Sequence, residues 1–178
     1  YARLKDIDKH GYGIFASKCM FRLTENNVIE PVASADKQSL LDFVGYEEER
    51  GKIIKNTEDF LNNKPCLNAL LYGDAGTGKS STVKAIANEY FKEGLRLIEI
   101  RKDQLHSLPL VMEKISVNPL KFIIFIDDLS FNQNDDNFSM LKAALEGSAS
   151  AKAKNAVIYA TSNRRHIVKE SFADRNCD

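Results

Sequence analysis

Hydrophobic and polar positions along this chain form segments of two kinds, and their order predicts the fold. Short apolar runs typical of buried strands cover residues 67–72, 95–100, 121–127 and 155–162. Amphipathic segments typical of helices cover residues 46–62, 80–92, 108–115 and 137–146. Strands that alternate with helices indicate βαβ units. We therefore expect an α/β protein with a parallel sheet and helices on both of its faces.

Several residues at the ends of these helices support their boundaries. Three glutamates (47–49) fall in the first turn of the first helix, where the helix dipole favours acids. Gly94 is placed to end the second helix. Ser107 is the expected N-cap of the third helix, with Pro109 tolerated in its first turn.

The N-terminal part of the chain has a different pattern. Apolar residues at 12–23 and 28–32 flank an Asn-containing turn, which favours a hairpin-like arm, and a helix over 12–23 competes with it. We favour an arm that packs on its own domain over one that contacts a partner. Because residues 32–37 are small and polar, we expect an arm and connector over 1–37 and a core domain over 38–178.

The composition narrows the class of protein. The 178 residues include 25 Lys and Arg and 25 Asp and Glu, and 43% are hydrophobic. A balanced charge argues against binding to nucleic acid or an anionic membrane through a bulk cationic field. The length and apolar share are sufficient for one buried core and exclude a disordered chain.

The cysteines and the apolar runs help to predict the cellular compartment of the protein. Cys19, Cys66 and Cys177 are far apart and fit neither a disulfide framework nor a zinc site. The apolar runs are far shorter than the ~20 residues that a membrane span needs, and no signal-peptide pattern opens the chain. We expect a cytoplasmic protein with no membrane partner. The first residue is Tyr1 rather than Met, which favours a piece of a longer protein.

A phosphate-binding loop is the strongest motif. Residues 73–80 read G-D-A-G-T-G-K-S and fit G-x-x-x-x-G-K-[ST], between a strand pattern and a helix pattern. The glycines let main-chain N–H groups approach phosphate oxygens, and the helix N-terminus adds its positive dipole end. Lys79 is placed to bind the β- and γ-phosphates, and the Ser80 hydroxyl is placed to bind Mg²⁺.

The alternative is a glycine-rich turn that binds nothing, and it leaves the Lys and Ser unexplained. The residues that we expect to hold the nucleotide are Gly73, Asp74, Ala75, Gly76, Thr77, Gly78, Lys79, Ser80 and Ser81.

Two carboxylates follow the apolar run at 122–126. Because ligands of open parallel sheets lie beyond the carboxyl ends of the strands, Asp127 and Asp128 should face the phosphate loop. We expect Asp127 to hold Mg²⁺, directly or through water, and Asp128 to polarise an attacking water. The alternative is a solvated acidic turn, which fits Asp128 better than Asp127.

The next strand also ends in polar residues. Asn163 can donate to a γ-phosphate or orient water, and its alternative is a polar cap between strand and loop. The expected catalytic groups are therefore Lys79, Asp128 and Asn163. A basic cluster at 164–166 is more often a solvated loop than a contact to phosphate, another subunit or nucleic acid.

The phosphate loop, the Asp127–Asp128 pair and Asn163 together resemble the AAA+ ATPases, with Asn163 in the place of sensor 1. The stretches at 41–48, 125–131 and 159–166 resemble more narrowly a bacterial branch of AAA+ ATPases catalogued only as a domain of unknown function. The resemblance covers residues 10–175. It implies an adenine pocket near Val44 and Gly45, in the segment before the first core strand.

The chain departs from the AAA+ pattern in two places. Most AAA+ proteins carry Glu at the position of Asp128, so the shorter side chain puts the hydrolysis rate in doubt. The family continues after sensor 1 into a fifth strand, an arginine finger and a lid with a sensor 2 Arg, and we expect this chain to lack them. No motif supports Arg175 as the finger.

These features imply Mg²⁺-dependent ATP binding and hydrolysis, with ADP as product, at a site completed by a neighbouring subunit of a homo-oligomer. The nucleotide state would drive remodelling or loading of a macromolecular partner, and nucleic acid is one candidate. The alternative is a nucleotide-dependent binding module with little or no hydrolysis. A small-molecule kinase is disfavoured because no second substrate pocket is visible in the sequence.

Overall fold

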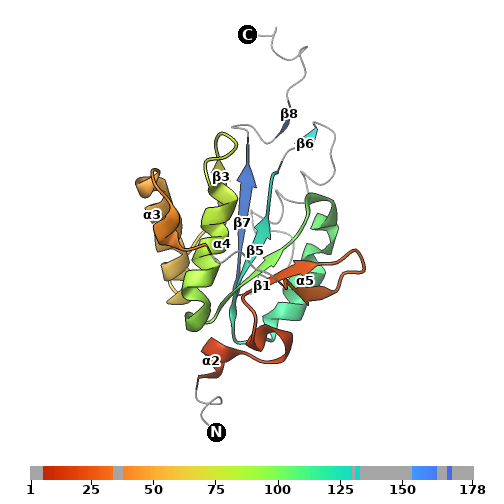
Figure 1. Cartoon of the computed structure of the whole chain (residues 1–178). Helices are drawn as coiled ribbons and strands as arrows, with labels where there is room; N and C mark the ends of the chain where they lie inside the picture. Colours follow the sequence, from red (N-terminus) through yellow and green to blue (C-terminus); the bar gives the residue numbers. More distant parts are fainter. Residues whose placement is uncertain (1–5, 34–37, 130, 133–153, 164–167, 170–178) are drawn as a thin grey trace.

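The computed structural model describes residues 6–33, 38–129, 131–132, 154–163 and 168–169 (Figure 1). Its centre is a six-stranded sheet in the order β2-β1-β4-β5-β7-β3. Every neighbouring pair runs parallel except β1 and β2. The strands are β1 (Met20–Leu23), β2 (Ile29–Pro31), β3 (Ala69–Tyr72), β4 (Leu95–Glu99), β5 (Lys121–Ile126) and β7 (Ala156–Ser162).

Helices cover both faces of this sheet (Figure 1). One face packs against α3 (Glu47–Leu61) and α4 (Lys79–Glu89), through apolar side chains that include Ile53, Phe60, Val83 and Ile86. The other face packs against α5 (Leu108–Ser116), through Leu108, Val111 and Ile115. Alternate residues of β5 point to opposite clusters, as the two-residue repeat of a strand requires. The α/β prediction with a parallel sheet is therefore confirmed.

Smaller elements complete the described residues. A short helix α2 (Ile7–His10) precedes β1, and β6 (Phe131–Asn132) pairs in parallel with β8 (Val168–Lys169). Four 3₁₀ helices cover Gly13–Ala16, Leu40–Asp42, Tyr90–Glu93 and Lys102–Ser107. The helix predicted over 137–146 lies outside the described residues.

The predicted N-terminal hairpin is present, and it packs on its own domain. β1 and β2 form an antiparallel pair, with Leu23 opposite Ile29, and β1 also pairs in parallel with β4. The hairpin therefore extends the central sheet. A 3₁₀ turn at Gly13–Ala16 is the only helical part of the segment for which a helix over 12–23 competed.

Two local predictions were wrong. The run at 67–72 was expected to be buried on both faces, but β3 is the outermost described strand of the sheet and its residues are half-buried or exposed. Ser107 lies at the N-cap position of α5, but the expected side-chain cap is absent, because its hydroxyl donates to Asn27 Oδ1 at 2.5 Å instead. Pro109 does lie in the first turn of α5. Both differences depend on contacts between distant parts of the chain, which a local sequence pattern does not predict.

Candidate nucleotide-binding site

The phosphate loop joins the end of β3 to the start of α4. Gly73, Gly76 and Gly78 have φ angles of 148°, 80° and 79°, in a region that residues with a side chain rarely adopt. The Gly73 N–H donates to Ser162 O at 3.3 Å, which ties the loop to the end of β7. Gly78 precedes the first turn of α4 and no side chain caps that turn. The N-terminal N–H groups of α4 therefore face the loop.

Lys79 lies inside this loop. Its ammonium donates to Gly73 O at 2.9 Å, to Asp74 O at 2.7 Å and to Thr77 Oγ1 at 3.3 Å. Thr77 Oγ1 in turn donates to Asp74 O at 2.9 Å. The ammonium thus brings its positive charge to the concave side of the loop, where an anion would lie.

Ser80 and Asp127 meet although they are far apart in the sequence. Ser80 Oγ, in the first turn of α4, donates to Asp127 Oδ1 at 2.5 Å, just beyond the end of β5. A hydroxyl and a carboxylate are the hard oxygen ligands that Mg²⁺ prefers, and such sites use one or two protein ligands together with phosphates. The described residues contain no group of three or more His, Cys, Asp or Glu that could hold a metal by themselves. The pair therefore fits a magnesium ion shared with a nucleotide.

Asp128 and Asn163 form the second polar pair. Asn163 Nδ2 donates to Asp128 Oδ1 at 2.8 Å, and both side chains are exposed at the carboxyl edge of the sheet. Asp128 has a φ of 52°, an uncommon conformation for a residue with a side chain. The structure thus brings together the two residues expected to act on the attacking water.

Sequence reasoning missed the role of Thr161. This buried residue of β7 donates from Oγ1 to Asp127 Oδ1 and accepts from the Asp128 N–H at 3.0 Å. A polar side chain two residues before Asn163 was the available signal, because residues i and i+2 of a strand share a face. The neighbouring Ser162 has a different role, since its hydroxyl donates to Leu129 O at 2.8 Å.

The segment expected to contact adenine lies beside the phosphate loop. The Phe43 ring lies 3.5 Å from the position that a Cβ on Gly78 would occupy. Val44 is 96% exposed, and Gly45 has a φ of 83°. Arg50, on α3, donates to Phe43 O at 3.3 Å and to Gly45 O, and its guanidinium lies 5.2 Å from the centre of the Phe43 ring.

A cavity of about 660 Å³ opens between α3 and β3 and continues into the phosphate loop. It includes Arg50 and Tyr46 at the end nearest the segment 43–45, although neither Val44 nor Gly45 lines it. The remaining lining residues are Glu49, Lys52, Ile53, Asn56, Leu67, Asn68, Ala69, Leu70, Leu71, Tyr72, Gly73, Asp74, Thr77, Lys79 and Thr82. The volume suits a ligand of nucleotide size.

A buried polar network lies behind this cavity. The Tyr159 hydroxyl accepts from Asn56 Nδ2 at 2.9 Å and shares a hydrogen bond with Thr57 Oγ1 at 2.9 Å. Burial raises the pKa of the Tyr159 hydroxyl above its ordinary value, and the hydrogen bonds oppose that rise. Asn56 also bonds both the N–H and the carbonyl of Leu67. The network fixes α3 to β7 and to the chain entering β3, so its role is structural.

The basic cluster at 164–166 and Arg175 lie outside the described residues. Within the described part of the chain, no helix has the length and apolar character needed to cross a membrane.

The sequence is similar to that of known proteins. A family model described as "Protein of unknown function (DUF815)" matches residues 16–178. The replication factor C large subunit of Staphylothermus marinus is 41% identical over 64 residues, which are 35% of this chain and 14% of that protein. Replication factor C subunit 4 of Homo sapiens is 32% identical over 96 residues, which are 51% of this chain and 26% of that protein. The alignments thus span about a quarter of these relatives or less.

Proposed function

The chain belongs to the family described as protein of unknown function DUF815, and we propose that it binds Mg²⁺-ATP at the phosphate loop and hydrolyses it. Its fold and its distant similarity to replication factor C subunits support a nucleotide-binding AAA+ protein. Hydrolysis is the further step. The observation that carries it is the pairing of Ser80 with Asp127 and of Asp128 with Asn163 at one sheet edge.

Each residue has a distinct part in this reaction. The loop N–H groups and Lys79 bind the phosphates, and Lys79 stabilises charge that develops on the γ-phosphate. Ser80 and Asp127 would hold Mg²⁺, which neutralises phosphate charge when bound. Asp128 orients the attacking water, and the hydrogen bond from Asn163 fixes the direction of its carboxylate.

A binding module with little hydrolysis is the second candidate, and one observation favours it. Asp128 has the shorter of the two acidic side chains, and Asn163 already bonds one of its oxygens. A carboxylate held back in this way reaches a water near the γ-phosphate less readily than Glu would.

Calorimetry with ATP and phosphate release can test both steps. Lys79→Ala should weaken ATP binding a hundredfold or more, because it removes the charge at the phosphates. Lys84→Ala, later on the same helix, removes a lysine that lies 3.4 Å from the Glu99 carboxylate and should change little. Equal ATP affinity in the two variants would contradict the phosphate site.

Asp128→Asn separates the enzyme from the binding module. If Asp128 orients the water, the variant keeps its ATP affinity and its phosphate release falls at least tenfold. Equal rates near zero in the variant and the unaltered chain would leave only the binding module.

We extend the proposal to assembly and partners. The site would be completed by a neighbouring copy in a homo-oligomer, and the nucleotide state would load or remodel a macromolecule. The names of the relatives refer to replication, which makes DNA the first partner to test. Light scattering with and without ATP, and phosphate release with and without DNA, test these two statements separately.

A further inference from the structure

Thr161 occupies the place where β7 meets the acidic end of β5. Ile126, the last residue of β5, pairs with Ala160, so Thr161 lies level with the first residue after β5. Its side chain is 2% exposed. Its hydroxyl makes two contacts, donating to Asp127 Oδ1 and accepting from the Asp128 N–H at 3.0 Å. One buried hydroxyl therefore bonds both residues of the acidic pair.

The first contact determines how the Asp127 carboxylate is oriented. Oδ1 accepts from Ser80 Oγ at 2.5 Å, from the Asp128 N–H at 3.1 Å and from Thr161 Oγ1. Three donors occupy this oxygen, so Oδ2 is the oxygen left to face a metal or its bound water. Ser80 belongs to the phosphate loop and Asp128 to the acidic pair, whereas Thr161 comes from the neighbouring strand β7.

The second contact supports the unusual backbone of Asp128. A φ of 52° is unfavourable for a residue with a side chain and persists where surrounding contacts impose it. The Asp128 N–H is held by Thr161 Oγ1 and Asp127 Oδ1, and its carboxylate is held by Asn163. Thr161 and Asn163 lie two residues apart on one face of the chain leaving β7, so this strand fixes both the backbone and the side chain of Asp128.

The neighbouring Ser162 has a hydroxyl that bonds a different part of the same turn. Ser162 is fully buried, like Thr161, but its hydroxyl donates to Leu129 O at 2.8 Å. It therefore stabilises the turn after the acids. The pair provides a matched comparison in one strand.

We propose that Thr161 is a positioning residue, whose hydroxyl directs Asp127 toward the magnesium ion and holds Asp128 in its left-handed conformation. The proposal rests on the proposed function, because it assigns the orientation of groups in that same site. It predicts that removing the hydroxyl reduces the gain in ATP affinity that Mg²⁺ provides and lowers the rate of ATP hydrolysis. The affinity for ATP without a metal ion should stay unchanged.

The test compares Thr161→Val, Thr161→Ser and Ser162→Ala in the full chain, by calorimetry of ATP with Mg²⁺ and with EDTA and by phosphate release. Valine has nearly the volume of threonine and lacks the hydroxyl. For Thr161→Val we expect the gain in ATP affinity on adding Mg²⁺ to shrink about tenfold and kcat to fall about tenfold, as happens when a residue that orients a metal ligand is changed. Thr161→Ser should restore both, and Ser162→Ala should change neither.

Two results would overturn the proposal. One is a Thr161→Val variant with the magnesium gain and kcat of the unaltered chain. The other is an equal loss in Ser162→Ala, which would indicate general packing. If Thr161→Val does not fold, judged by its thermal transition, Thr161→Cys gives the same test with a weak donor. Absence of ATP binding by the unaltered chain would instead contradict the proposed function itself.

Discussion

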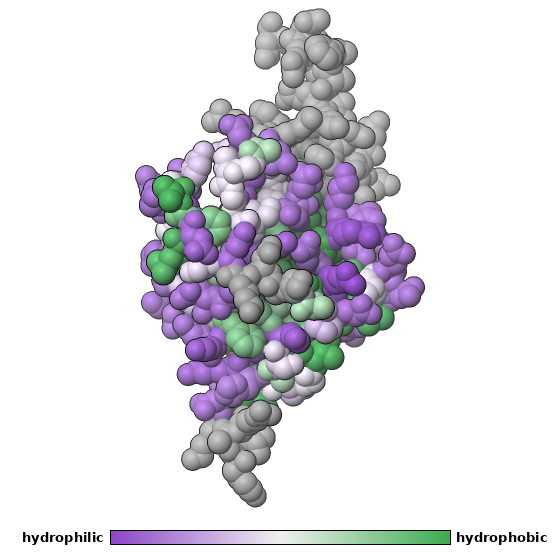
Figure 2. Space-filling view, viewed as in Figure 1, coloured by the Kyte–Doolittle hydropathy of each residue, from purple (hydrophilic) through white to green (hydrophobic). Residues whose placement is uncertain are grey.

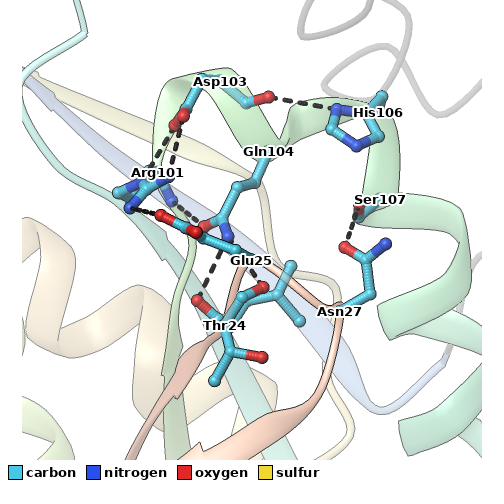
Figure 3. Close-up of polar contacts among 9 residues, drawn as sticks. Thr24, Glu25, Asn27, Arg101, Asp103, Gln104, His106 and Ser107 are labelled. Carbon is cyan, nitrogen blue, oxygen red and sulfur yellow. Dashed lines mark hydrogen bonds and ion pairs between the residues drawn. The ribbon is translucent and has the colours of Figure 1, made fainter.

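The two edges of the central sheet are built in different ways. At the β2–β1 edge, the 3₁₀ helix Lys102–Ser107 closes over the hairpin turn (Figure 3). Gln104 Nε2 donates to Leu23 O at 3.2 Å and to Thr24 O at 3.0 Å, and Ser107 Oγ donates to Asn27 Oδ1. Lys114 adds a bond to Asn27 O at 2.8 Å. Side chains therefore satisfy the carbonyls of this turn.

The β3 edge is open among the residues that the structure describes. Among the described residues β3 pairs only with β7, and the cavity of about 660 Å³ lies along it. Figure 2 shows apolar side chains at the surface on the side where α3 lies, and Leu41, Val44 and Tyr46 are 93%, 96% and 58% exposed. Tyr46 also has a φ of 56°, which is a genuine outlier for a bulky residue.

We infer from this difference that the hairpin edge contributes to stability and the β3 edge to binding. Unfavourable backbone conformations and exposed apolar groups tend to be found where ligands bind, because such a site is completed by its ligand. The hairpin edge has fewer such features, namely a φ of 57° at Asn27 and a half-exposed Val28, and its polar groups bond one another. We therefore expect changes at the hairpin edge to lower the free energy of unfolding and changes at the β3 edge to alter nucleotide affinity.

The largest expected effect comes from Gln104→Met. The carboxamide is 5% exposed, bonds two carbonyls and accepts from the Arg101 N–H at 3.2 Å. Methionine keeps the volume and leaves those groups unsatisfied, so we expect a loss of about 2–3 kcal/mol in the free energy of unfolding. Urea unfolding measures it, with the exposed Glu113→Gln as control. A variant with unchanged stability, or with weakened ATP binding, would contradict the separation of the two edges.

The second prediction concerns the stability contributed by Cys19, which precedes β1, and this contribution depends on pH. The Cys19 thiol donates to Ala87 O at 3.1 Å, and burial raises its pKa from 9.0 to about 11. Because the folded state holds this proton more tightly, its contribution is complete below pH 9 and is lost as pH rises from 9 to 11. The loss is about 2 kcal/mol.

Cys19→Ser tests this statement, because its hydroxyl does not ionise in that range. Unfolding midpoints at pH 8, 9.5 and 11 should show a shallower alkaline decline for Cys19→Ser than for Cys66→Ser. Tyr159, whose pKa is raised mainly by burial and in part by the charge of Cys66, also adds to the decline in both variants. Identical declines would show that the Cys19 thiol does not cause it.

The next prediction changes the open edge. Arg50→Ala removes the guanidinium that bonds Phe43 O and Gly45 O, while the phosphate loop keeps its own contacts. If the segment 43–45 contacts adenine, ATP affinity should fall about fivefold, near 1 kcal/mol, because the segment is less preorganised. Affinity for tripolyphosphate, which has no base, should not change.

Lys55→Ala, on the exposed side of the same helix, is the matched control for Arg50→Ala. An equal loss of ATP and tripolyphosphate affinity would place the effect of Arg50 on the phosphate loop instead, and unchanged ATP affinity would argue against a base site at 43–45.

The sequence correctly predicted the elements that follow from hydrophobic periodicity or from a contiguous motif. The strand before Asp127 and the helices α3, α4 and α5 are of this kind, and so is the position of the loop at 73–80 between β3 and α4. It was insufficient where a side chain had a choice of partners from elsewhere in the chain. Ser107 fits an N-cap pattern, yet Asn27 lies closer in the fold. Thr161 is one of three consecutive polar residues, and only the register of β7 with β5 shows that it reaches the acids.

The smallest expected effect tests whether charge contributes to the closed edge. Arg101 donates to Asp103 at 2.9 Å and lies 3.8 Å from Glu25, with side chains that are 57%, 61% and 83% exposed. The hydrogen bond from Arg101 lowers the pKa of Asp103, but exposed pairs contribute little to stability and are screened by salt. Arg101→Gln should therefore leave the urea midpoint unchanged at 0.15 M and 0.5 M salt. A salt-dependent loss comparable to that of Gln104→Met would show that ion pairs, rather than the buried carboxamide, hold the hairpin.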